Sequence, residues 1–372
     1  MKTKVITACL ALSLAANYAT AQMRRSDYSF PNTAEYKVLN CDLHQHTVFS
    51  DGTVWPTVRV NEAWEESLDV IVLSEHIEYR RFSDDIKTKD HNRSWELAHE
   101  DAKRLGITLI RSCEITRALP AGHLNAIGIK DANAFEKFMS KKNRTDTLNV
   151  HAALREAKAQ GAFIQWNHPA YPEMHWGDVQ KQFINEGLID GIEVINGECY
   201  VSEAFDWCLD HNLTITSNTD VHSTMAQKRA SDQSKTMTLL LAKSQSEEDV
   251  MEALYAGRSA GLWRDNMYGR EQVVSEIVSS AIKINICQAA EANKGFIEIE
   301  NNSSMPYTVE VVDRSESLKF WCGQTMIFGG NERMALDGSI VGDDELFITL
   351  KFHNVFITPT ENLVVKIPVS KI

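Results

Sequence analysis

The sequence is short of positive charge. Its 38 lysines and arginines stand against 51 aspartates and glutamates, which gives a formal net charge of −13. It has no basic run and no alternation of basic with aromatic residues. Such a surface repels long polyanions, so nucleic-acid binding is not expected as the main activity. A small anionic substrate is not excluded, because divalent cations inside a pocket can reverse the local field.

Long apolar segments are also lacking beyond the N-terminus. The apolar stretch Val5 to Ala16 follows Lys2 and Lys4 and precedes the small-x-small sequence Ala19-Thr20-Ala21. This order predicts a signal peptide over residues 1–21. The stretch is too short for a stable membrane anchor, and no later segment stays apolar for about 18 residues. We therefore expect an exported protein, periplasmic or secreted, with no membrane span.

The cysteines are scattered, and no two of them form a C-x-x-C pair. This spacing argues against a zinc knuckle and against a dense disulfide framework. Cys41 and Cys113 lie in apolar, strand-like segments and are expected to be buried thiols. Cys199 and Cys208 are close enough in sequence to pair, although free thiols are favoured for them.

Short apolar strands alternate with amphipathic helices from about residue 36 onward. The alternation predicts a parallel sheet, and the number of strands favours a closed β/α barrel over an open sheet. The expected strands are Val38–Leu43, Val70–Leu73, Ile107–Ile110, Leu124–Ile129, Ala162–Trp166, Gly191–Ile195, Leu213–Ser217 and Met237–Leu241. The expected helices are Val58–Ser67, Trp95–Leu105, Val150–Gln160, Ser202–His211, Glu247–Tyr255 and, last, Arg270–Ser280.

The pattern changes after about residue 280. Period-two alternation follows in segments such as Ile282–Ile286, Phe296–Glu300 and Leu363–Val369. It predicts a small antiparallel β-domain, most simply a sandwich. We therefore expect a barrel over residues 22–280 and an accessory β-domain over residues 281–372. No low-complexity linker separates them, so the two are expected to pack together.

Histidines and carboxylates recur where the predicted strands end. Asp42-Leu43-His44-Gln45-His46 ends the first strand, and Asp220-Val221-His222 follows the seventh. Residues i and i+2 of a strand point the same way, so His44 and His46 can present two imidazoles to one centre. In a β/α barrel the strand ends surround one mouth. Imidazoles and carboxylates without a thiolate suit Zn, Mn or Fe.

The segment Asp42 to Gly52, which reads DLHQHTVFSDG, resembles the first motif of the polymerase and histidinol phosphatase (PHP) superfamily. The later motifs occur in the family's order, and the similarity covers about residues 36–265. They are Glu75-His76, Glu114, His123, Asn167-His168-Pro169 and Asp220-Val221-His222. The resemblance implies a distorted (β/α)7 barrel, two or three divalent metal ions (Zn, Mn or Fe) and phosphoester hydrolysis.

When the metal-ligand positions of the family are transferred to this sequence one by one, the resemblance implies nine metal ligands. They are His44, His46, Asp51, His76, Glu114, His123, His168, Asp220 and His222. Glu114 is the expected bridging ligand, and Glu114 and Asp51 are expected to act directly in catalysis. Glu75 and Glu78 depart from the family, which commonly has aspartate at both positions, and this puts the geometry around the ligands in doubt.

Loop residues at the same mouth are candidates for contacts with the substrate. Arg117 is the preferred arginine for the non-bridging phosphate oxygens, because only three residues separate it from Glu114. Arg80 and Arg81 are the alternatives. Tyr171 either packs at the mouth or contacts the substrate, and Asn196 either forms a turn or contacts the substrate.

Export and the added β-domain make the chain similar to secreted phosphodiesterases of the superfamily that act on small organophosphate diesters. The predicted function is therefore hydrolysis of a small phosphodiester by a hydroxide generated at the metal site. A phosphomonoesterase of the histidinol-phosphatase type is the first alternative, and hydrolysis of a C–N or carboxylic ester bond is another. A non-catalytic binding module, whose barrel has lost its metals, is a third.

Overall fold

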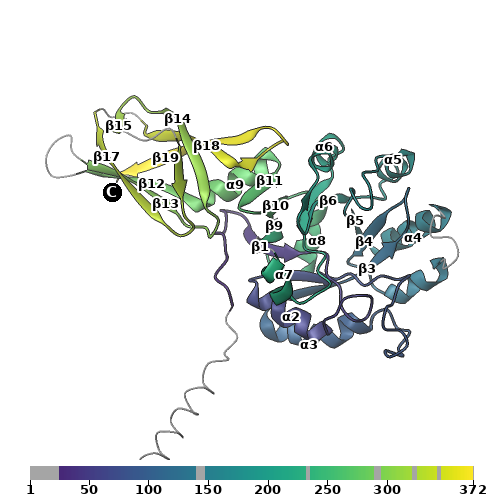
Figure 1. Cartoon of the computed structure of the whole chain (residues 1–372). Coiled ribbons are helices and arrows are strands. Elements are labelled where there is room, and N and C mark those ends of the chain that lie inside the picture. The colour runs from purple at the N-terminus through teal and green to yellow at the C-terminus, as the bar shows by residue number, and fades with distance from the viewer. Residues whose placement is uncertain are drawn as a thin grey trace, which may run out of the picture.

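The computed structural model describes residues 25–139, 147–231, 235–288, 295–320, 325–341 and 345–371. The predicted signal peptide, residues 1–21, lies outside the described residues. Within these ranges no helix is both long and apolar enough to cross a membrane. The chain forms a sheet flanked by helices and, beside it, a region built mostly of strands (Figure 1).

The helix-flanked part alternates strands with helices, as predicted. Its strands are β1 (Lys37–Asp42), β2 (Val70–Leu73), β3 (Thr108–Thr116), β4 (His123–Ile127), β5 (Phe163–Trp166), β6 (Gly191–Asn196), β7 (Cys199–Tyr200), β8 (Thr214–Asn218), β9 (Thr236–Ala242), β10 (Ser259–Trp263) and β11 (Asn266–Gly269). Its helices are α2 (Pro56–Glu65), α3 (Arg93–Leu105), η1 (Ala132–Phe138), α4 (Thr147–Gln160), α5 (Asp178–Asn185), α6 (Ser202–Asp210), α7 (Met225–Ser231) and α8 (Glu247–Tyr255).

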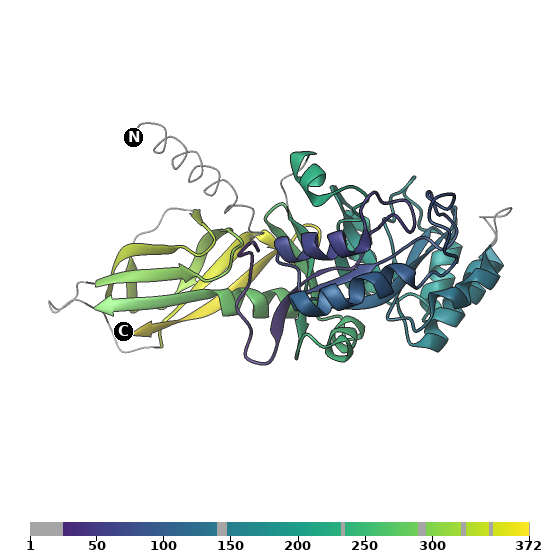
Figure 2. The same ribbon diagram turned by 90° about the horizontal axis from the view of Figure 1, so that it is seen from below.

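Local sequence signals explain several helix ends. Pro56 opens α2, where its missing N–H group costs no hydrogen bond. The hydroxyl of Ser246 caps α8 by accepting from the Asp249 N–H at 3.2 Å. α3 ends at Gly106, whose φ of 72° lies in the left-handed region that glycine adopts freely. Figure 2 shows α2 (purple) and α3 (blue) side by side against the sheet, where they pack on each other.

The sheet is mixed, so the prediction of a parallel sheet is only partly right. Hydrogen bonding gives the strand order β8–β6–β5–β4–β3–β2–β1–β9–β10–β11. The pairs β1–β2, β2–β3, β5–β6 and β6–β8 are parallel. β4 and β9 run antiparallel to both of their neighbours. Only the short segment 117–122 separates β3 from β4, whereas a parallel crossover needs about a dozen residues or more.

The direction of β4 decides where His123 lies. His123 is the first residue of β4 and stands opposite Thr116, the last residue of β3. Of the predicted ligands, His123 alone stands at the start of its strand, whereas the others lie near or after the end of a strand. Because β4 is reversed, its first residue reaches the same end of the sheet as the last residues of β3 and β5.

Hydroxyl side chains connect β8 to the strands at the other end of the order. Thr238 of β9 donates to the Ser217 carbonyl of β8 at 2.9 Å. Ser217 in turn donates to the Leu262 carbonyl of β10 at 3.0 Å, and Ser259 of β10 donates to the Ile215 carbonyl at 2.7 Å. These bonds bring the two ends of the sheet together.

The rest of the chain follows α9 (Glu271–Ala281) and is β structure. Its strands are β12 (Ile282–Gln288), β13 (Gly295–Asn301), β14 (Tyr307–Arg314), β15 (Leu318–Phe320), β16 (Met326–Phe328), β17 (Arg333–Ile340), β18 (Phe347–Phe356) and β19 (Asn362–Lys371). Most pairs are antiparallel, as predicted: β12–β13, β13–β17, β15–β17, β18–β19, β14–β18 and β14–β16. The pair β12–β19 is parallel.

A row of stacked aromatic rings joins the two parts. Tyr200 of β7 stacks on Tyr268 of β11, with ring centroids 4.5 Å apart and an interplanar angle of 28°. Tyr268 stacks on Phe356 of β18 at 5.1 Å and 10°. The backbones of β11 and β18 pair in parallel at the same place. One hydrophobic cluster also runs from Val60 in α2 through α9 to Val369 in β19, so the two parts pack together.

The cysteines of the described residues are unpaired. Cys41 and Cys113 are buried thiols, which confirms the prediction for both. Cys208 is also buried, whereas Cys199 in β7 is exposed, and the two do not form a disulfide.

Candidate metal centre

The predicted ligands meet at one end of the mixed sheet. His44, His46 and Asp51 follow β1, His76 follows β2, Glu114 lies in β3, His123 opens β4, His168 follows β5, and Asp220 and His222 follow β8. They form four overlapping groups whose ligand atoms lie within 4.8 Å of one another. The groups are His46, Asp51, His76 and His222; His44, His46 and Asp220; His44, Glu114 and His168; and His76, Glu114 and His123.

Two short segments run side by side at the centre of this cluster. The Asp220 N–H donates to the His44 carbonyl at 2.9 Å, and the His46 N–H donates to the Val221 carbonyl at 3.1 Å. Gly52 packs against the backbone of His46, and a Cβ atom there would lie 2.7 Å from the His46 carbonyl. Only glycine therefore allows this approach of the loop to the ligand segment.

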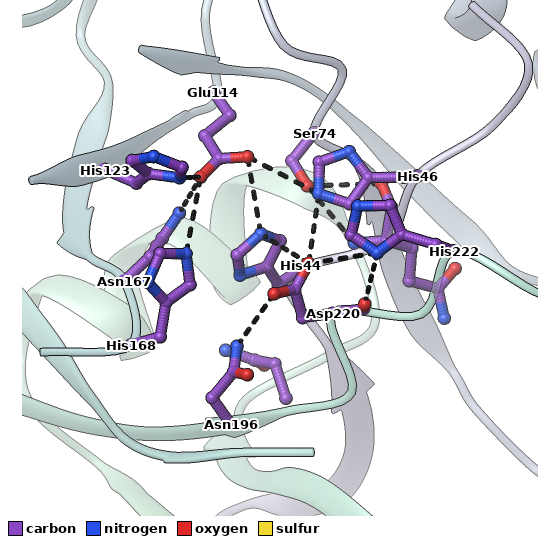
Figure 3. Close-up of polar contacts among 12 residues, drawn as sticks. His44, His46, Ser74, Glu114, His123, Asn167, His168, Asn196, Asp220 and His222 are labelled. Carbon is purple, nitrogen blue, oxygen red and sulfur yellow. Dashed lines mark hydrogen bonds and ion pairs between the residues drawn. The ribbon is translucent and has the colours of Figure 1, made fainter. Parts of the chain in front are cut away.

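Carboxylate oxygens lie between the imidazole nitrogens. Asp220 Oδ1 is 3.2 Å from His44 Nε2 and 3.1 Å from His46 Nε2. Glu114 Oε2 lies 3.6 Å and 3.4 Å from the same two nitrogens. Its other oxygen, Oε1, is 2.9 Å from His123 Nδ1. Figure 3 shows Glu114 between His123 and His168 on one side and His46 and His222 on the other.

A third carboxylate completes the cluster nearer the surface. Asp51 Oδ1 lies 3.1 Å from His222 Nε2 and 3.4 Å from His76 Nε2. Donors held about 2.1 Å from one cation stand about 3.0 Å apart at octahedral angles and about 3.4 Å apart at tetrahedral angles. The spacings in the cluster are therefore those of ligands around shared cations.

Several buried polar atoms of the cluster have no hydrogen-bond partner in the described chain. They are His44 Nε2, His46 Nε2, Asp51 Oδ1, Glu114 Oε2, His168 Nδ1 and Asp220 Oδ1. Leaving a buried polar group unsatisfied costs about 1–3 kcal/mol. Atoms of this kind rarely gather in one place without a ligand, and divalent cations would satisfy those of His44, His46, Asp51, Glu114 and Asp220. The residues therefore fit a multinuclear metal site.

The ionisation of the cluster follows from its crowding. Burial opposes charge on Glu114, but His76 and His123 hold the pKa of its carboxyl well below the usual range. Burial and the neighbouring His76 lower the pKa of His46 to about 3, so this imidazole is neutral and able to ligate. For His76 the effect of burial is outweighed by Glu114 and Asp51, which raise its pKa to about 10. A metal would replace the proton on His76.

Two ligands have strained backbones. The φ angles of Asp220 and His168 are 50° and 30°, in the left-handed region. A non-glycine residue there costs about 1–3 kcal/mol, and such strain concentrates at functional sites. Each position is held by a hydrogen bond from its own N–H group, to the His44 carbonyl for Asp220 and to Glu193 Oε2 at 2.9 Å for His168.

Comparison with known proteins agrees with this geometry. No protein-family model and no curated protein sequence matches the chain. Among solved structures it is similar to a two-domain protein of Bacteroides vulgatus that contains a predicted PHP-like metal-dependent phosphoesterase. The identity is 34%, the match covers 94% of this chain and 100% of that one, and the TM-score is 0.80. The chain belongs to the PHP-like metal-dependent phosphoesterases.

A second solved structure that resembles this PHP-like phosphoesterase is a candidate metal-dependent phosphoesterase of Bifidobacterium adolescentis. It is 17% identical, with a TM-score of 0.39, and the match covers 50% of this chain and 88% of that one. The match to the Bacteroides protein extends over nearly all of this chain, so the C-terminal strands are part of the shared architecture. An α/β fold with a second, β-rich part and a hydrolase activity are therefore confirmed.

A buried carboxylate that the sequence analysis did not single out positions His44 in this phosphoesterase. Glu193 in β6 is fully buried, and its Oε1 accepts from His44 Nδ1 at 3.1 Å and from Asn218 Nδ2 at 3.0 Å. Its Oε2 accepts from Asn196 Nδ2 and from the His168 N–H, both at 2.9 Å. A proton held on His44 Nδ1 leaves Nε2 free to ligate. The only signal in the sequence is a glutamate within an apolar strand.

We expect Glu193→Gln to weaken metal affinity about 10- to 100-fold, with a matching loss of activity at limiting metal. The substitution turns one acceptor into a donor that faces donors from Asn196, Asn218 and the His168 backbone. A titration against a competing chelator measures the affinity. Glu203→Gln, an exposed position on α6, is the matched control. Equal affinities for the two variants would show that Glu193 does not position the ligand.

Glu75, the first departure from the family pattern, supports the loop that carries His46. Its carboxylate accepts from the Thr47 hydroxyl at 2.5 Å and from the Ser50 hydroxyl at 2.6 Å. Ser50 Oγ also lies 3.2 Å from His46 Nδ1. The side chain therefore keeps the supporting role of a carboxylate beside the ligands, with one methylene more than aspartate.

Arg117, the predicted contact for phosphate oxygens, does not line the pocket over the cluster. Arg117 is buried, forms an ion pair with Glu78, and donates to the Thr116 and Phe138 carbonyls at 2.9 Å and 2.8 Å. Glu78, the second departure from the family, also accepts from the Thr116 N–H at 2.8 Å. In this position the guanidinium is occupied by partners of the chain itself.

A pocket of about 470 Å³ opens over the cluster. Seven cluster residues form its floor: Asp51, His76, Glu114, His123, His168, Asp220 and His222. His44 and His46 lie behind them, fully buried. The remaining lining residues are Ala170, Tyr171, Asn196, Cys199 and Val201. The pocket has the size of a small-molecule site, about 300–1,000 Å³.

Proposed function

We propose that this PHP-like phosphoesterase hydrolyses small phosphodiesters, with its nine-residue cluster holding two or three divalent ions (Zn, Mn or Fe). The observation that carries the proposal is the convergence of buried, unpartnered carboxylate and imidazole atoms on the floor of one pocket. Imidazoles alone would suit a single ion. Carboxylates can share their oxygens between two ions, so the mixed ligands of this cluster suit more than one ion.

The divalent ions supply a nucleophile from water near neutral pH and neutralise charge on the phosphoryl oxygens. Glu114 directs one oxygen toward His44 and His46 and the other toward His123, so it is suited to bridge two positions. Asp51, His76 and His222 define a further position nearer the opening. Asn196 Nδ2 donates to Asp220 Oδ2 at 3.2 Å and orients that carboxylate.

A diester is favoured over a monoester by what lines the pocket. Of the described residues that line it, none is a lysine or an arginine. A diester carries one negative charge, and a monoester at neutral pH carries nearly two. Beyond the divalent ions, the described lining offers no cationic side chain for the second charge of a monoester, which favours the diester. The pocket is also lined by Ala170, Tyr171, Cys199 and Val201, uncharged residues that suit contact with a second organic arm.

Metal analysis combined with two substrates tests the function. Mature protein purified without chelators is expected to hold about two or three equivalents of metal by mass spectrometry. It should hydrolyse bis-p-nitrophenyl phosphate faster than p-nitrophenyl phosphate, lose this activity on chelation and regain it with metal. A preference for the monoester would favour a histidinol-phosphatase type of enzyme. Less than one equivalent after reconstitution would favour a binding module.

We also propose that the mixed sheet is the distorted (β/α)7 barrel of the superfamily and that β12 to β19 form a β-sandwich. The hydroxyl bonds between β8 and the strands β9 and β10 support closure of the barrel. A crystal structure in which β8 stands apart from both strands would contradict it.

A further inference from the structure

One wall of the pocket has a chemistry unlike that of the floor. Ala170 and Tyr171 come from the loop after β5, and Cys199 and Val201 come from the β6–β7 hairpin and its end. We call these four residues the arm wall. None of them carries a charge, and all four line the same pocket as the predicted metal ligands.

Tyr171 of the arm wall is exposed, with 66% of its surface accessible. Its ring stands edge-on to the imidazole of His168, with centroids 5.6 Å apart and an interplanar angle of 87°. Its backbone N–H donates to the His168 carbonyl at 2.9 Å, which ties the residue to the ligand. An aromatic surface is thus fixed beside the cluster and left open to contact a neighbouring group.

The charges that line the pocket disfavour a substrate whose second alcohol arm is anionic. The described lining residues contain no cationic side chain, and the three arginines considered from the sequence do not line the pocket. Carboxylates lie on the floor at Asp51, Glu114 and Asp220. A second anionic group on the substrate would therefore meet no opposite charge on the arm wall and would lose its hydration without compensation.

We propose that the arm wall receives one uncharged, largely apolar alcohol arm of the phosphodiester, with Tyr171 as the main contact. The proposal rests on the proposed function and names its substrate class: esters whose second arm is neutral. Bisphosphates and esters with a carboxylate on that arm are rejected. Specificity then depends on the loop after β5 and on the β6–β7 hairpin, while the metal floor binds the phosphoryl group.

Binding of three phosphonates to the metal-loaded protein tests this inference by calorimetry. Methylphosphonate, phenylphosphonate and 3-carboxyphenylphosphonate share one metal-binding head and differ only in the arm. We expect phenylphosphonate to bind about tenfold more tightly than either of the others. Tyr171→Ala should raise the Kd of phenylphosphonate about fivefold and leave that of methylphosphonate within about twofold.

A variant that is expected to bind one phosphonate more tightly controls for loss of binding caused by misfolding. Cys199 is exposed, so Cys199→Lys is expected to fold and to place a positive charge on the arm wall. This variant should lower the Kd of 3-carboxyphenylphosphonate about tenfold and leave the Kd of phenylphosphonate nearly unchanged. Equal Kd values for the three phosphonates, or unchanged Kd values in both variants, would overturn the proposal that the arm wall receives the alcohol arm. Turnover of bis-p-nitrophenyl phosphate, measured in parallel, reports separately on the proposed function.

Discussion

Glu114→Gln is expected to lower turnover of bis-p-nitrophenyl phosphate by about 1,000-fold or more, or about 4 kcal/mol of activation free energy. Glu114 is the one carboxylate whose two oxygens serve different groups of histidines, Oε2 facing His44 and His46 and Oε1 facing His123. Glutamine keeps the size of the side chain but removes its charge and presents an amide NH₂ group to imidazole nitrogens. At least one equivalent of metal should be lost, which mass spectrometry measures together with the rate.

A control variant must show that the loss of turnover in Glu114→Gln does not come from misfolding. Glu252→Gln, at an exposed salt bridge with Arg258 at the end of α8, removes a glutamate charge far from the pocket and should retain full activity. The far-UV circular dichroism of the two variants should agree. A Glu114→Gln protein that keeps a tenth of the activity and all of its metal would show that Glu114 is not a bridging ligand.

Arg117→Met is expected to reduce stability by about 3–5 kcal/mol while leaving turnover by the folded, metal-loaded enzyme within a few-fold. Its guanidinium is buried against Glu78, so the substitution leaves a carboxylate buried without its partner. Thermal unfolding should show a clear drop in Tm. The double variant Arg117→Met, Glu78→Gln should recover part of the loss, because glutamine is neutral and still accepts from the Thr116 N–H.

The opposite outcome would support the predicted contact between Arg117 and the substrate. A single variant with an unchanged Tm and a rate lowered 100-fold would place Arg117 in contact with the substrate. Measuring Tm and turnover on the same preparation separates the two cases.

Much of the site could be read from the sequence because parallel strand ends converge. Histidines and carboxylates after the predicted strands had to meet at one mouth, and the structure brings all nine together. The reversed direction of β4 was missed, because alternation of apolar residues is the same for either direction. The six residues between Thr116 and His123 were the available signal, since they are too few for a crossover.

Other features leave little trace in a single sequence. Glu193 acts through His44 across 149 positions, a separation that no local pattern records. The β10–β11 hairpin was missed because its turn is made by Arg264 and Asp265, with φ angles of 49° and 58°. Such turns usually contain glycine or asparagine, so the usual turn signal is absent. The pairing of β11 with β18 depends on the folded core and could not be predicted from either segment.

The row of stacked rings from Tyr200 to Phe356 limits how this enzyme can be shortened. A chain ending after α9 would keep β11 but lose β18, which leaves one backbone edge of β11 bare and removes Phe356 from the face of Tyr268. Bare strand edges with apolar surroundings favour association between molecules. Because Tyr200 lies between Cys199 and Val201, removing the C-terminal strands would also loosen the arm wall of the pocket. Under the proposed role of the arm wall, the C-terminal strands support the surface that selects the substrate, and we expect the smallest unit for engineering new substrates to include them.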